Sequence, residues 1–377
     1  MSRGGKAAQT LPPRARSLGE RLLGVAAHLI IVPCWTVSPF LPVLALVAVG
    51  WSHGLVGIVV AVSCFFAIFF GPPGFLFSGV VWLVPFAMAL AAPAATRTSA
   101  ALGSLAFGLF LYIINCAPFA PWEGFYRLVT ERMSGTLYYD RIELRGALEE
   151  IRPGRTFFAA HPHGILCCGW GWNCIWNSEF HKRTGPIGFL IDSNLKDKNP
   201  LFRVLADWYK GEQRYFEVAS GDRIRRAMER GDSLSIVPGG FQDATLLEYG
   251  KDRTMIKKRK GFIKYCLQYG YRLTPVYTFG ETSTFHTWTG ALDFRLWLNK
   301  FGIPAVAIFG NPLIPFLPRT DAPLLTYVGA PLELPKVEKP TPEEVDLWHG
   351  RYLEALKALF EEKKAEAGYP NAVLEIW

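Results

Sequence analysis

An early part of the chain, residues 22–122, is almost free of charged side chains. Between Leu22 and Trp122 the only Asp, Glu, Lys or Arg is Arg97. A helix that spans a bilayer needs about 20 apolar residues, and a charge at the bilayer centre costs at least roughly 2.5–3.5 kcal/mol. The pattern predicts two to four membrane-embedded helical segments within residues 22–122, drawn from the stretches Val25–Val49, Leu55–Phe70, Phe75–Ala92 and Ala101–Cys116.

The residues before this block predict its orientation. Residues 1–21 are basic and resemble a disordered tail, and Arg14, Arg16 and Arg21 place that tail in the cytosol by the positive-inside rule. Residues 123–377 are also rich in Lys and Arg, so we expect an even number of spans, two or four. A cleaved signal peptide is the alternative, but the first apolar stretch is too long and further ones follow it.

Residues 123–377 have a different pattern, in which short β-rich runs alternate with helical ones. Such alternation predicts an α/β domain with helices flanking a sheet. The predicted strands are Arg155–Ala160, Ser233–Val237, Leu273–Phe279 and Leu325–Val328, and the predicted helices between them are Asp222–Arg230 and Arg259–Tyr269.

The clearest predicted helix lies near the end of the chain. Thr341 is a good N-cap, Pro342 suits the first helical position, and Glu344 completes a capping box. Apolar residues then recur at three- and four-residue steps, which predicts an amphipathic helix that packs on the domain. These residues are Val345, Trp348, Tyr352, Leu356 and Leu359.

Composition narrows the class of protein. The chain has 377 residues, 50% of them hydrophobic, and a formal net charge of +8. A basic surplus suits contact with anionic lipid or with a phosphorylated substrate. Nucleic acid is disfavoured as a partner because no nucleic-acid-binding motif is present. The seven cysteines lack paired metal-ligand spacing, which indicates reduced, buried thiols.

The strongest chemical motif is His161-Pro162-His163-Gly164, which follows a predicted strand. Loops at strand ends commonly carry catalytic groups, and a histidine can accept a proton from an alcohol near neutral pH. Pro162 restricts the chain between the two rings, and Gly164 permits a turn or a close approach of substrate. Two structural histidines or half of a metal site are the alternatives, but no further ligands complete a coordination sphere.

A second candidate feature is the turn that follows Ser233–Val237. It contains Gly239 and Gly240, with Asp243 three residues later. Backbone N–H groups at such a turn can hold a developing oxyanion or a phosphate, and Asp243 can orient a histidine. An ordinary turn, with the acid capping the next helix, is the alternative.

Two further features are weaker. The run Lys257–Lys260 (KKRK) suits the phosphates of a nucleotide or anionic lipid, although a solvated basic face is nearly as good an explanation. Glu281 follows the strand Leu273–Phe279, where it supports the site or simply begins a helix. His286 and His349 have no motif context and are treated as structural.

In this order, these motifs resemble the type 2 diacylglycerol acyltransferase family, which includes monoacylglycerol and wax-alcohol acyltransferases. The resemblance runs from about Tyr139 to the C-terminus. It rests on HPHG at His161–Gly164, the Gly-Gly-x-x-acid stretch at Gly239–Asp243, RKGFIKYCLQYG at Arg259–Gly270, PVYTFGE at Pro275–Glu281 and the terminal run that begins VGAPLELPKVEKPTPEEVDLWHG.

The chain departs from that family in two respects. The family usually has Glu where this chain has Asp243, and it typically has one hydrophobic hairpin rather than up to four apolar segments.

The family is similar to the glycerolipid acyltransferases, which implies a related sheet flanked by helices. Those enzymes use a His, then four residues and then an Asp, whereas here the fifth residue after His161 is Leu166 and the fifth after His163 is Cys168. The orienting acid must come from elsewhere, with Asp243 first and Glu281 second.

The resemblance implies transfer of a fatty acyl group from acyl-CoA to diacylglycerol, with a histidine of the motif as general base. Arg259, with Lys258 and Lys260, would hold the phosphates of coenzyme A. A covalent route through Cys167 or Cys168 ranks lower.

The implied setting is the endoplasmic reticulum membrane, with several spans and the catalytic domain facing the cytosol; lipid droplets are a second location. No cofactor or metal is expected. Monoacylglycerol or a long-chain alcohol as acceptor, a non-catalytic lipid-binding protein and a homo-oligomer stay open.

Overall fold

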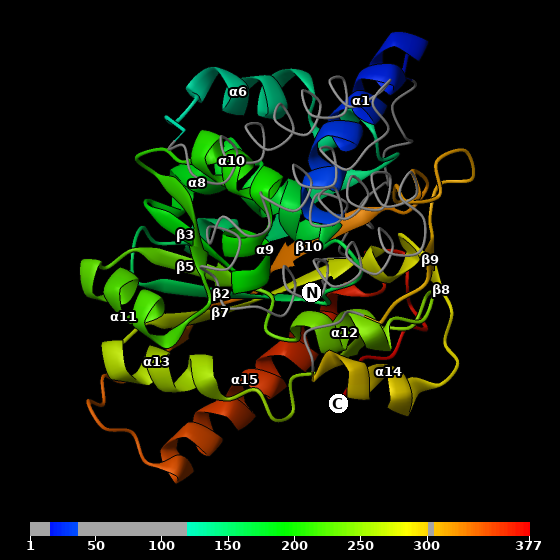
Figure 1. Ribbon diagram of the computed structural model, residues 1–377. Helices are drawn as coiled ribbons and strands as arrows, with labels where there is room; N and C mark the ends of the chain where they lie inside the picture. Colours follow the sequence, from blue (N-terminus) through cyan, green and yellow to red (C-terminus); the bar gives the residue numbers. More distant parts are fainter. Residues whose placement is uncertain (1–15, 37–118, 301–304) are drawn as a thin grey trace, which may run out of the picture. The chain divides into compact units, whose positions relative to one another are not determined.

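The computed structural model describes residues 16–36, 119–300 and 305–377 (Figure 1). The chain divides into two compact units. Of the described residues, the larger unit comprises 16–29, 124–190, 211–300 and 305–377, and the smaller comprises 30–36, 119–123 and 191–210.

The larger unit is built on one eight-stranded mixed sheet. Its strands are β1 (Ile142–Gly146), β2 (Thr156–His161), β3 (Ile187–Ile191), β4 (Arg214–Val218), β5 (Ser233–Ile236), β7 (Arg272–Phe279), β10 (Leu324–Val328) and β11 (Leu332–Glu333). Their order is β1-β10-β7-β2-β5-β3-β4, and β11 also pairs with β7. The strands β7, β2, β5 and β3 are parallel neighbours, whereas β10 and β11 run antiparallel to β7.

The central strands are buried on both faces, as expected where helices cover both sides of a parallel sheet. All six residues of β2 are buried. Because side chains alternate along a strand, Phe157 and Ala159 join the core on one face, while Phe158 contacts Phe180 on the other.

Helices form a layer on each face (Figure 1). On one face, α11 (Gly221–Arg230), α13 (Gly261–Tyr269) and α15 (Pro342–Lys363) share the core cluster with β2 and β7. On the other face, α7 (Cys168–Trp170) and α8 (Ser178–Thr184) contact β2, β3 and β5 through Trp170 and Phe180.

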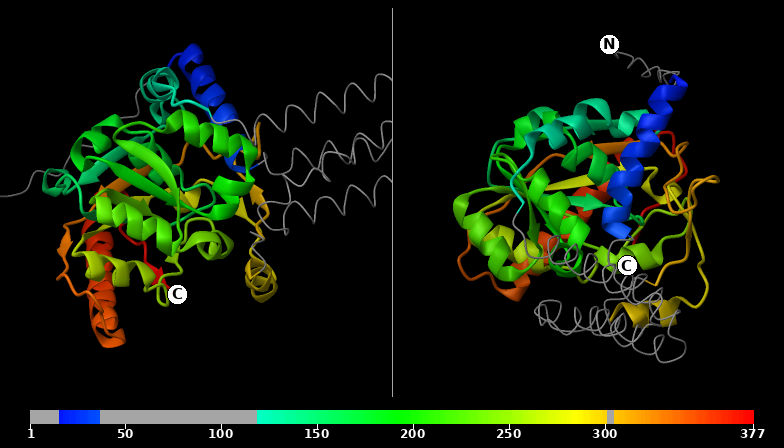
Figure 2. Two further views of the ribbon diagram at one scale, coloured as in Figure 1. Left: turned by 60° about the vertical axis from the view of Figure 1, so that its left-hand side comes forward. Right: turned by 45° about the horizontal axis from the view of Figure 1, so that its top comes forward.

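Shorter elements complete this unit. The helices are α6 (Glu123–Arg127), α12 (Gly240–Leu246) and α14 (Leu292–Asn299); the single turns of π or 3-10 helix are Leu128–Arg132, Gly135–Leu137, Leu148–Glu150, Gly171–Ile175 and Glu281–Ser283. Two small sheets pair β6 (Arg253–Thr254) with β12 (Glu375–Ile376), and β8 (His286–Thr287) with β9 (Ile308–Phe309). Figure 2 shows the ribbon from two further directions.

The sequence predictions for this α/β part are confirmed. The four predicted strands correspond to β2, β5, β7 and β10, and the predicted internal helices correspond to α11 and α13. The third predicted helix is α15, whose capping box is formed: Thr341 accepts from the Glu344 backbone, and the Glu344 side chain accepts from the Thr341 backbone.

In the smaller unit, α9 (Ser193–Lys198) is followed directly by α10 (Pro200–Tyr209). The side chain of Asn199 caps α10 by accepting from the backbone N–H of Phe202 at 3.0 Å. Val204 of α10 is buried against Phe119, Leu201 and Trp208.

The helix α1 (Leu18–Thr36) begins inside the predicted tail 1–21, and its first half belongs to the larger unit. Its buried His28 stacks on Tyr138 and accepts from the indole N–H of Trp172 at 3.1 Å. No helix within the described residues is both long and apolar enough to cross a membrane. Most of the four predicted apolar stretches, from residue 37 to residue 116, lies outside the described residues, so membrane-spanning helices stay a prediction.

Candidate active site

Three strand ends bring the predicted site residues together. The strands β5, β2 and β7 are adjacent and parallel, so their carboxyl ends lie at one edge of the sheet, where ligand sites of α/β proteins form. The motif His161–Gly164 follows β2, the turn at Gly239 follows β5, and Glu281 follows β7. The topology therefore joins motifs that are about 40 to 120 positions apart in the sequence.

His161, the last residue of β2, is buried and held at both ring nitrogens. Its Nδ1 lies 2.9 Å from Thr254 Oγ1, and its Nε2 lies 2.9 Å from the hydroxyl of Tyr352 on α15. Burial lowers its pKa from 6.5 to about 3, so the ring is neutral. Because both ring nitrogens are hydrogen-bonded inside the protein, His161 has a positioning role: it links the end of β2 to Thr254 and to Tyr352.

Asp243 reaches His161 through Thr254 rather than directly. The Thr254 hydroxyl donates to Asp243 Oδ2 at 3.1 Å, so its oxygen accepts the proton on His161 Nδ1. Asp243 also accepts from the backbone N–H groups of Met255 and His163. Burial raises its pKa from 3.8 to about 6, although these hydrogen bonds oppose the rise. Asp243 thus connects the loop after β2 to β6.

His163 differs from His161 in its exposure and its free nitrogen. Its side chain is only partly buried. Its Nδ1 lies 3.0 Å from the carbonyl oxygen of Gly164; because a carbonyl can only accept, the proton sits on Nδ1. Nε2 then carries the lone pair, and within the described part of the chain no hydrogen bond reaches it. Burial lowers the pKa of His163, partly offset by the bond to Gly164. A neutral ring with an available Nε2 is what a general base requires.

Both acids of the site lie against glycines, and this explains why those positions have no side chain. A Cβ on Gly239 would lie 1.9 Å from Asp243 Cγ, and a Cβ on Gly164 would lie 2.5 Å from Glu281 Oε1. Gly164 also has a φ of +58°, in the left-handed region that glycine tolerates best.

Glu281 holds the first turn of α7. Its Oε1 accepts from the backbone N–H of Cys168 at 2.9 Å, and its Oε2 accepts from that of Gly169 at 2.7 Å. Burial raises its pKa from 4.5 to about 7. The carboxylate therefore holds the loop behind the histidines, and Glu281 also begins the short 3-10 helix Glu281–Ser283.

The cysteines beside the motif are poor nucleophiles. Cys167 and Cys168 are buried, and burial together with the charge of Glu281 raises both thiol pKa values well above the usual range. Since the thiolate is the reactive form, this environment disfavours a covalent route through either residue.

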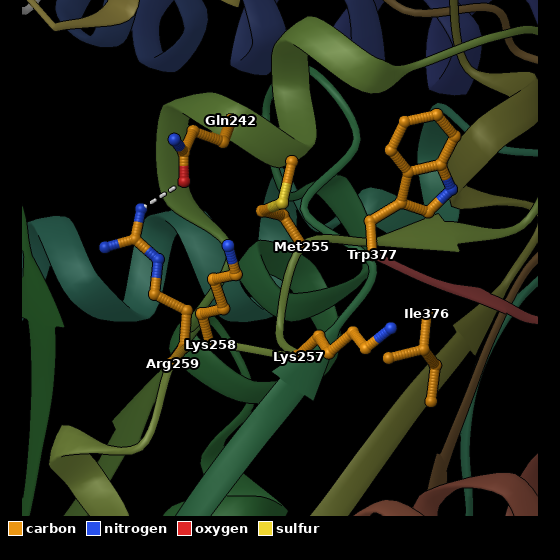
Figure 3. Close-up of a pocket in the computed structure, with 7 residues that line it drawn as sticks. All are labelled: Gln242, Met255, Lys257, Lys258, Arg259, Ile376 and Trp377. Atoms are coloured by element: carbon orange, nitrogen blue, oxygen red, sulfur yellow. Dashed lines mark hydrogen bonds between the residues drawn. The ribbon is translucent and has the colours of Figure 1, made fainter.

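The cationic run Lys257–Lys260 lies at a pocket next to the hydrogen-bonded residues His161, Thr254 and Asp243 (Figure 3). The pocket has a volume of about 450 Å³ and is lined by Gln242, Met255, Lys257, Lys258, Arg259, Ile376 and Trp377. Arg259 donates to the Gln242 side chain at 2.5 Å. Lys260, also predicted to hold phosphate, does not line the pocket; its ammonium pairs with Asp346 of α15 at 2.5 Å.

Three residues of this region were not among the predicted site residues. Thr254 lies in a two-residue strand with no sequence signature, and Tyr352 was predicted only as part of the apolar face of α15. Trp377 lines the pocket because β12 pairs with β6. All three residues join the site only through the fold, because their partners are distant in sequence and no local pattern marks them.

Comparison with known proteins places the chain in a family. The family model described as "Diacylglycerol acyltransferase" matches residues 138–376. Diacylglycerol O-acyltransferase 2 of Danio rerio is 30% identical over 237 residues, which cover 58% of this chain and 63% of that protein. Acyl-CoA wax alcohol acyltransferase 1 of Mus musculus is 28% identical over 239 residues, or 59% of this chain and 71% of the relative.

A third relative, 2-acylglycerol O-acyltransferase 3 of Homo sapiens, is 30% identical over 246 residues, or 59% of this chain and 68% of the relative. The chain spans less than two thirds of the Danio rerio protein. No solved structure matches it. The match over residues 138–376 contains the histidine motif, both acids and the cationic run, and it shows that the chain belongs to the diacylglycerol acyltransferase family.

Proposed function

We propose that this chain transfers a fatty acyl group from acyl-CoA to the free hydroxyl of diacylglycerol, forming triacylglycerol. The observation that carries the proposal is the available Nε2 of His163 at the sheet edge, next to a fully bonded His161. Family membership supports the class of reaction, and the names of the relatives include diacylglycerol, monoacylglycerol and wax-alcohol acyltransferases.

In the proposed reaction, His163 Nε2 takes the proton from the acceptor hydroxyl while that oxygen attacks the thioester carbonyl. The tetrahedral intermediate collapses, the carbon–sulfur bond breaks, and the departing thiolate of coenzyme A takes the proton from His163. Products are the new ester and coenzyme A, so neither a metal nor a redox cofactor enters the balance. The backbone amides of Gly239 and Gly240 are proposed to stabilise the oxyanion.

The remaining residues have positioning roles in this proposal. His161, Thr254 and Asp243 form a hydrogen-bonded chain, and Asp243 also accepts from the His163 backbone. This arrangement fixes the loop that carries the base. Glu281 fixes the same loop from the side of α7.

The proposed location is the endoplasmic reticulum membrane, with lipid droplets as a second site. The proposal rests on the nearly uncharged residues 22–122, which would anchor the chain through two or four spans with the catalytic unit facing the cytosol. Such an arrangement would give the site access to both a lipid acceptor and cytosolic acyl-CoA.

An acceptor panel tests the proposal. Membranes containing the full chain are supplied with labelled oleoyl-CoA and, separately, with diacylglycerol, monoacylglycerol or a long-chain alcohol. Triacylglycerol should be the main product, and membranes carrying His163→Ala serve as the control. Abundant wax ester without triacylglycerol would reassign the acceptor, and no ester from any acceptor would favour a non-catalytic lipid-binding protein.

A further inference from the structure

The pocket beside α12 and β6 combines two kinds of recognition group. Three cations of the run, Lys257, Lys258 and Arg259, line it together with the indole of Trp377 (Figure 3). Its volume of about 450 Å³ lies within the range of roughly 300–1,000 Å³ that is typical of small-molecule sites. Cations bind phosphate, and a tryptophan face stacks on a nucleobase.

The three cations are available to an anionic ligand, whereas their neighbours are not. Lys260 pairs with Asp346, and Arg253 pairs with Glu248 and Glu375. Within the described residues, by contrast, Lys257, Lys258 and Arg259 form no ion pair with a carboxylate. Arg259 donates a hydrogen bond to the neutral side-chain amide of Gln242, and the charge of Arg259 also lowers the pKa of the buried Asp243.

The indole is held beside these cations by the end of the chain. The strand β12 pairs in parallel with β6, and the backbone N–H of Lys257 donates to the Trp377 backbone oxygen at 2.7 Å. The guanidinium of Arg253 lies 5.8 Å from the ring centre of Trp377. In Figure 3, Trp377 and Ile376 approach the pocket from one side, and Arg259 and Gln242 from the other.

The pocket also shares its walls with the catalytic network. Gln242 precedes Asp243 on α12, and Met255 follows Thr254, the residue that links Asp243 to His161. A ligand bound in the pocket therefore contacts α12, which carries Asp243, and the segment that follows β6, which carries Thr254. A lipid headgroup has phosphate chemistry but no planar base, so the indole favours a nucleotide.

We propose that this pocket binds the 3′-phosphoadenosine diphosphate part of acyl-CoA, with Lys257, Lys258 and Arg259 on its phosphates and the Trp377 indole stacked on its adenine. The inference rests on the proposed function and adds to it: it assigns Trp377 and Lys257 to the donor site and replaces Lys260, which is engaged with Asp346.

Steady-state kinetics of membranes containing the full chain test the assignment. Trp377→Ala should raise KM for oleoyl-CoA about tenfold, the change expected for loss of one base–aromatic stack, while kcat and KM for diacylglycerol stay within about twofold of wild type. Trp377→Phe should restore most of the affinity because it keeps an aromatic face. Lys257→Gln should also raise KM for oleoyl-CoA.

Two matched controls use side chains outside the pocket. Lys264→Gln neutralises an exposed lysine of α13, and Trp288→Ala removes an exposed indole; neither should change KM for oleoyl-CoA. Thermal unfolding of each variant shows whether the protein has kept its fold.

Inhibitors separate the base from the phosphates. Adenosine 3′,5′-bisphosphate should compete with oleoyl-CoA, and its inhibition constant should rise about tenfold in Trp377→Ala. The inhibition constant of pyrophosphate should rise in Lys257→Gln but not in Trp377→Ala. If folded Trp377→Ala leaves both KM for oleoyl-CoA and inhibition by the bisphosphate unchanged, the assignment is overturned.

A binding measurement keeps this inference distinct from the proposed function. Labelled coenzyme A should bind wild type in equilibrium dialysis and bind Trp377→Ala about tenfold more weakly. Binding that depends on Trp377, without any acyl transfer, would keep the nucleotide site and overturn the proposed function. Acyl transfer by wild type, together with unchanged binding of coenzyme A to Trp377→Ala, would keep the proposed function and overturn the nucleotide site.

Discussion

At the scale of single residues, the two motif histidines have different roles although they are two positions apart. His161 ends a buried strand, where Thr254 and Tyr352 occupy both of its ring nitrogens. His163 lies beyond that strand, is partly exposed, and has its proton fixed on Nδ1 by Gly164. The local environment, rather than the residue type, decides which ring can act as the base.

Substitution of each histidine should separate these roles. His163→Ala should lower kcat for triacylglycerol formation by about 10²–10⁴-fold, the usual contribution of a general base, with little change in stability. His161→Ala should lower the free energy of unfolding by about 1–3 kcal/mol, because it leaves buried partners unpaired. Acyl-transfer assays and urea unfolding check both. An active His163→Ala protein would exclude that ring as the base.

Burial of Glu281 predicts a pH dependence of stability. Its pKa is raised from 4.5 to about 7, so the folded state holds the proton more tightly than the unfolded chain does. A raised pKa adds stability that is full below pH 4.5 and is lost as the pH rises through about 7. Glu281→Gln lacks this titration. Relative to that variant, wild type should lose up to about 3 kcal/mol of unfolding free energy between pH 4.5 and pH 8.

Urea unfolding of both proteins at these two pH values measures the difference. Glu333→Gln, which changes an exposed carboxylate, is the control and should show no comparable change. A constant difference between wild type and Glu281→Gln across this range would mean that the carboxyl titrates normally.

At the scale of elements, the helices and strands that could be predicted are those with a recognisable pattern in their own residues. The helix α15 has its capping box and a recurring apolar face, and β2, β5, β7 and β10 are short runs rich in β-branched, aromatic and other apolar residues. The two-residue strands β6 and β12 have no such signal, since they form only because the end of the chain reaches Arg253 and Thr254. Those short strands nevertheless carry the link to His161 and one wall of the pocket.

The cap of α15 can be tested by itself. Thr341→Ala removes the hydroxyl that accepts from the Glu344 backbone and should lower the unfolding free energy by about 0.5–2 kcal/mol. Gly350→Ala in the same helix is a matched control of opposite sign, because a Cβ there meets open space and alanine is favoured over glycine by about 1 kcal/mol. Urea unfolding measures both variants. An unfolding free energy of Thr341→Ala equal to that of wild type would mean that the cap contributes little.

At the scale of the whole molecule, the catalytic unit depends on a sheet whose neighbours are distant in sequence. The strands β7 and β2 pair although more than a hundred positions separate them, and the site exists only where they meet. The proposed membrane anchor belongs to the same scale, since its number of spans decides which side the site faces.

That topology can be measured with tags at the two ends of the chain. Because an even number of spans is proposed, protease added to sealed endoplasmic reticulum vesicles should remove both tags without detergent. A luminal protein serves as the control and should stay protected. Protection of one tag alone would mean an odd number of spans.

The sequence by itself determined the α/β class, the main strands, α15 and the residues of the motif, because these depend on local apolar period, capping and residue chemistry. It also identified Asp243 and Glu281 as the acids near the site. Tertiary structure decided how they act: Asp243 reaches His161 through Thr254, and Glu281 holds α7. These contacts arise from parallel strands that bring distant segments to one sheet edge, and no local pattern encodes such a distance.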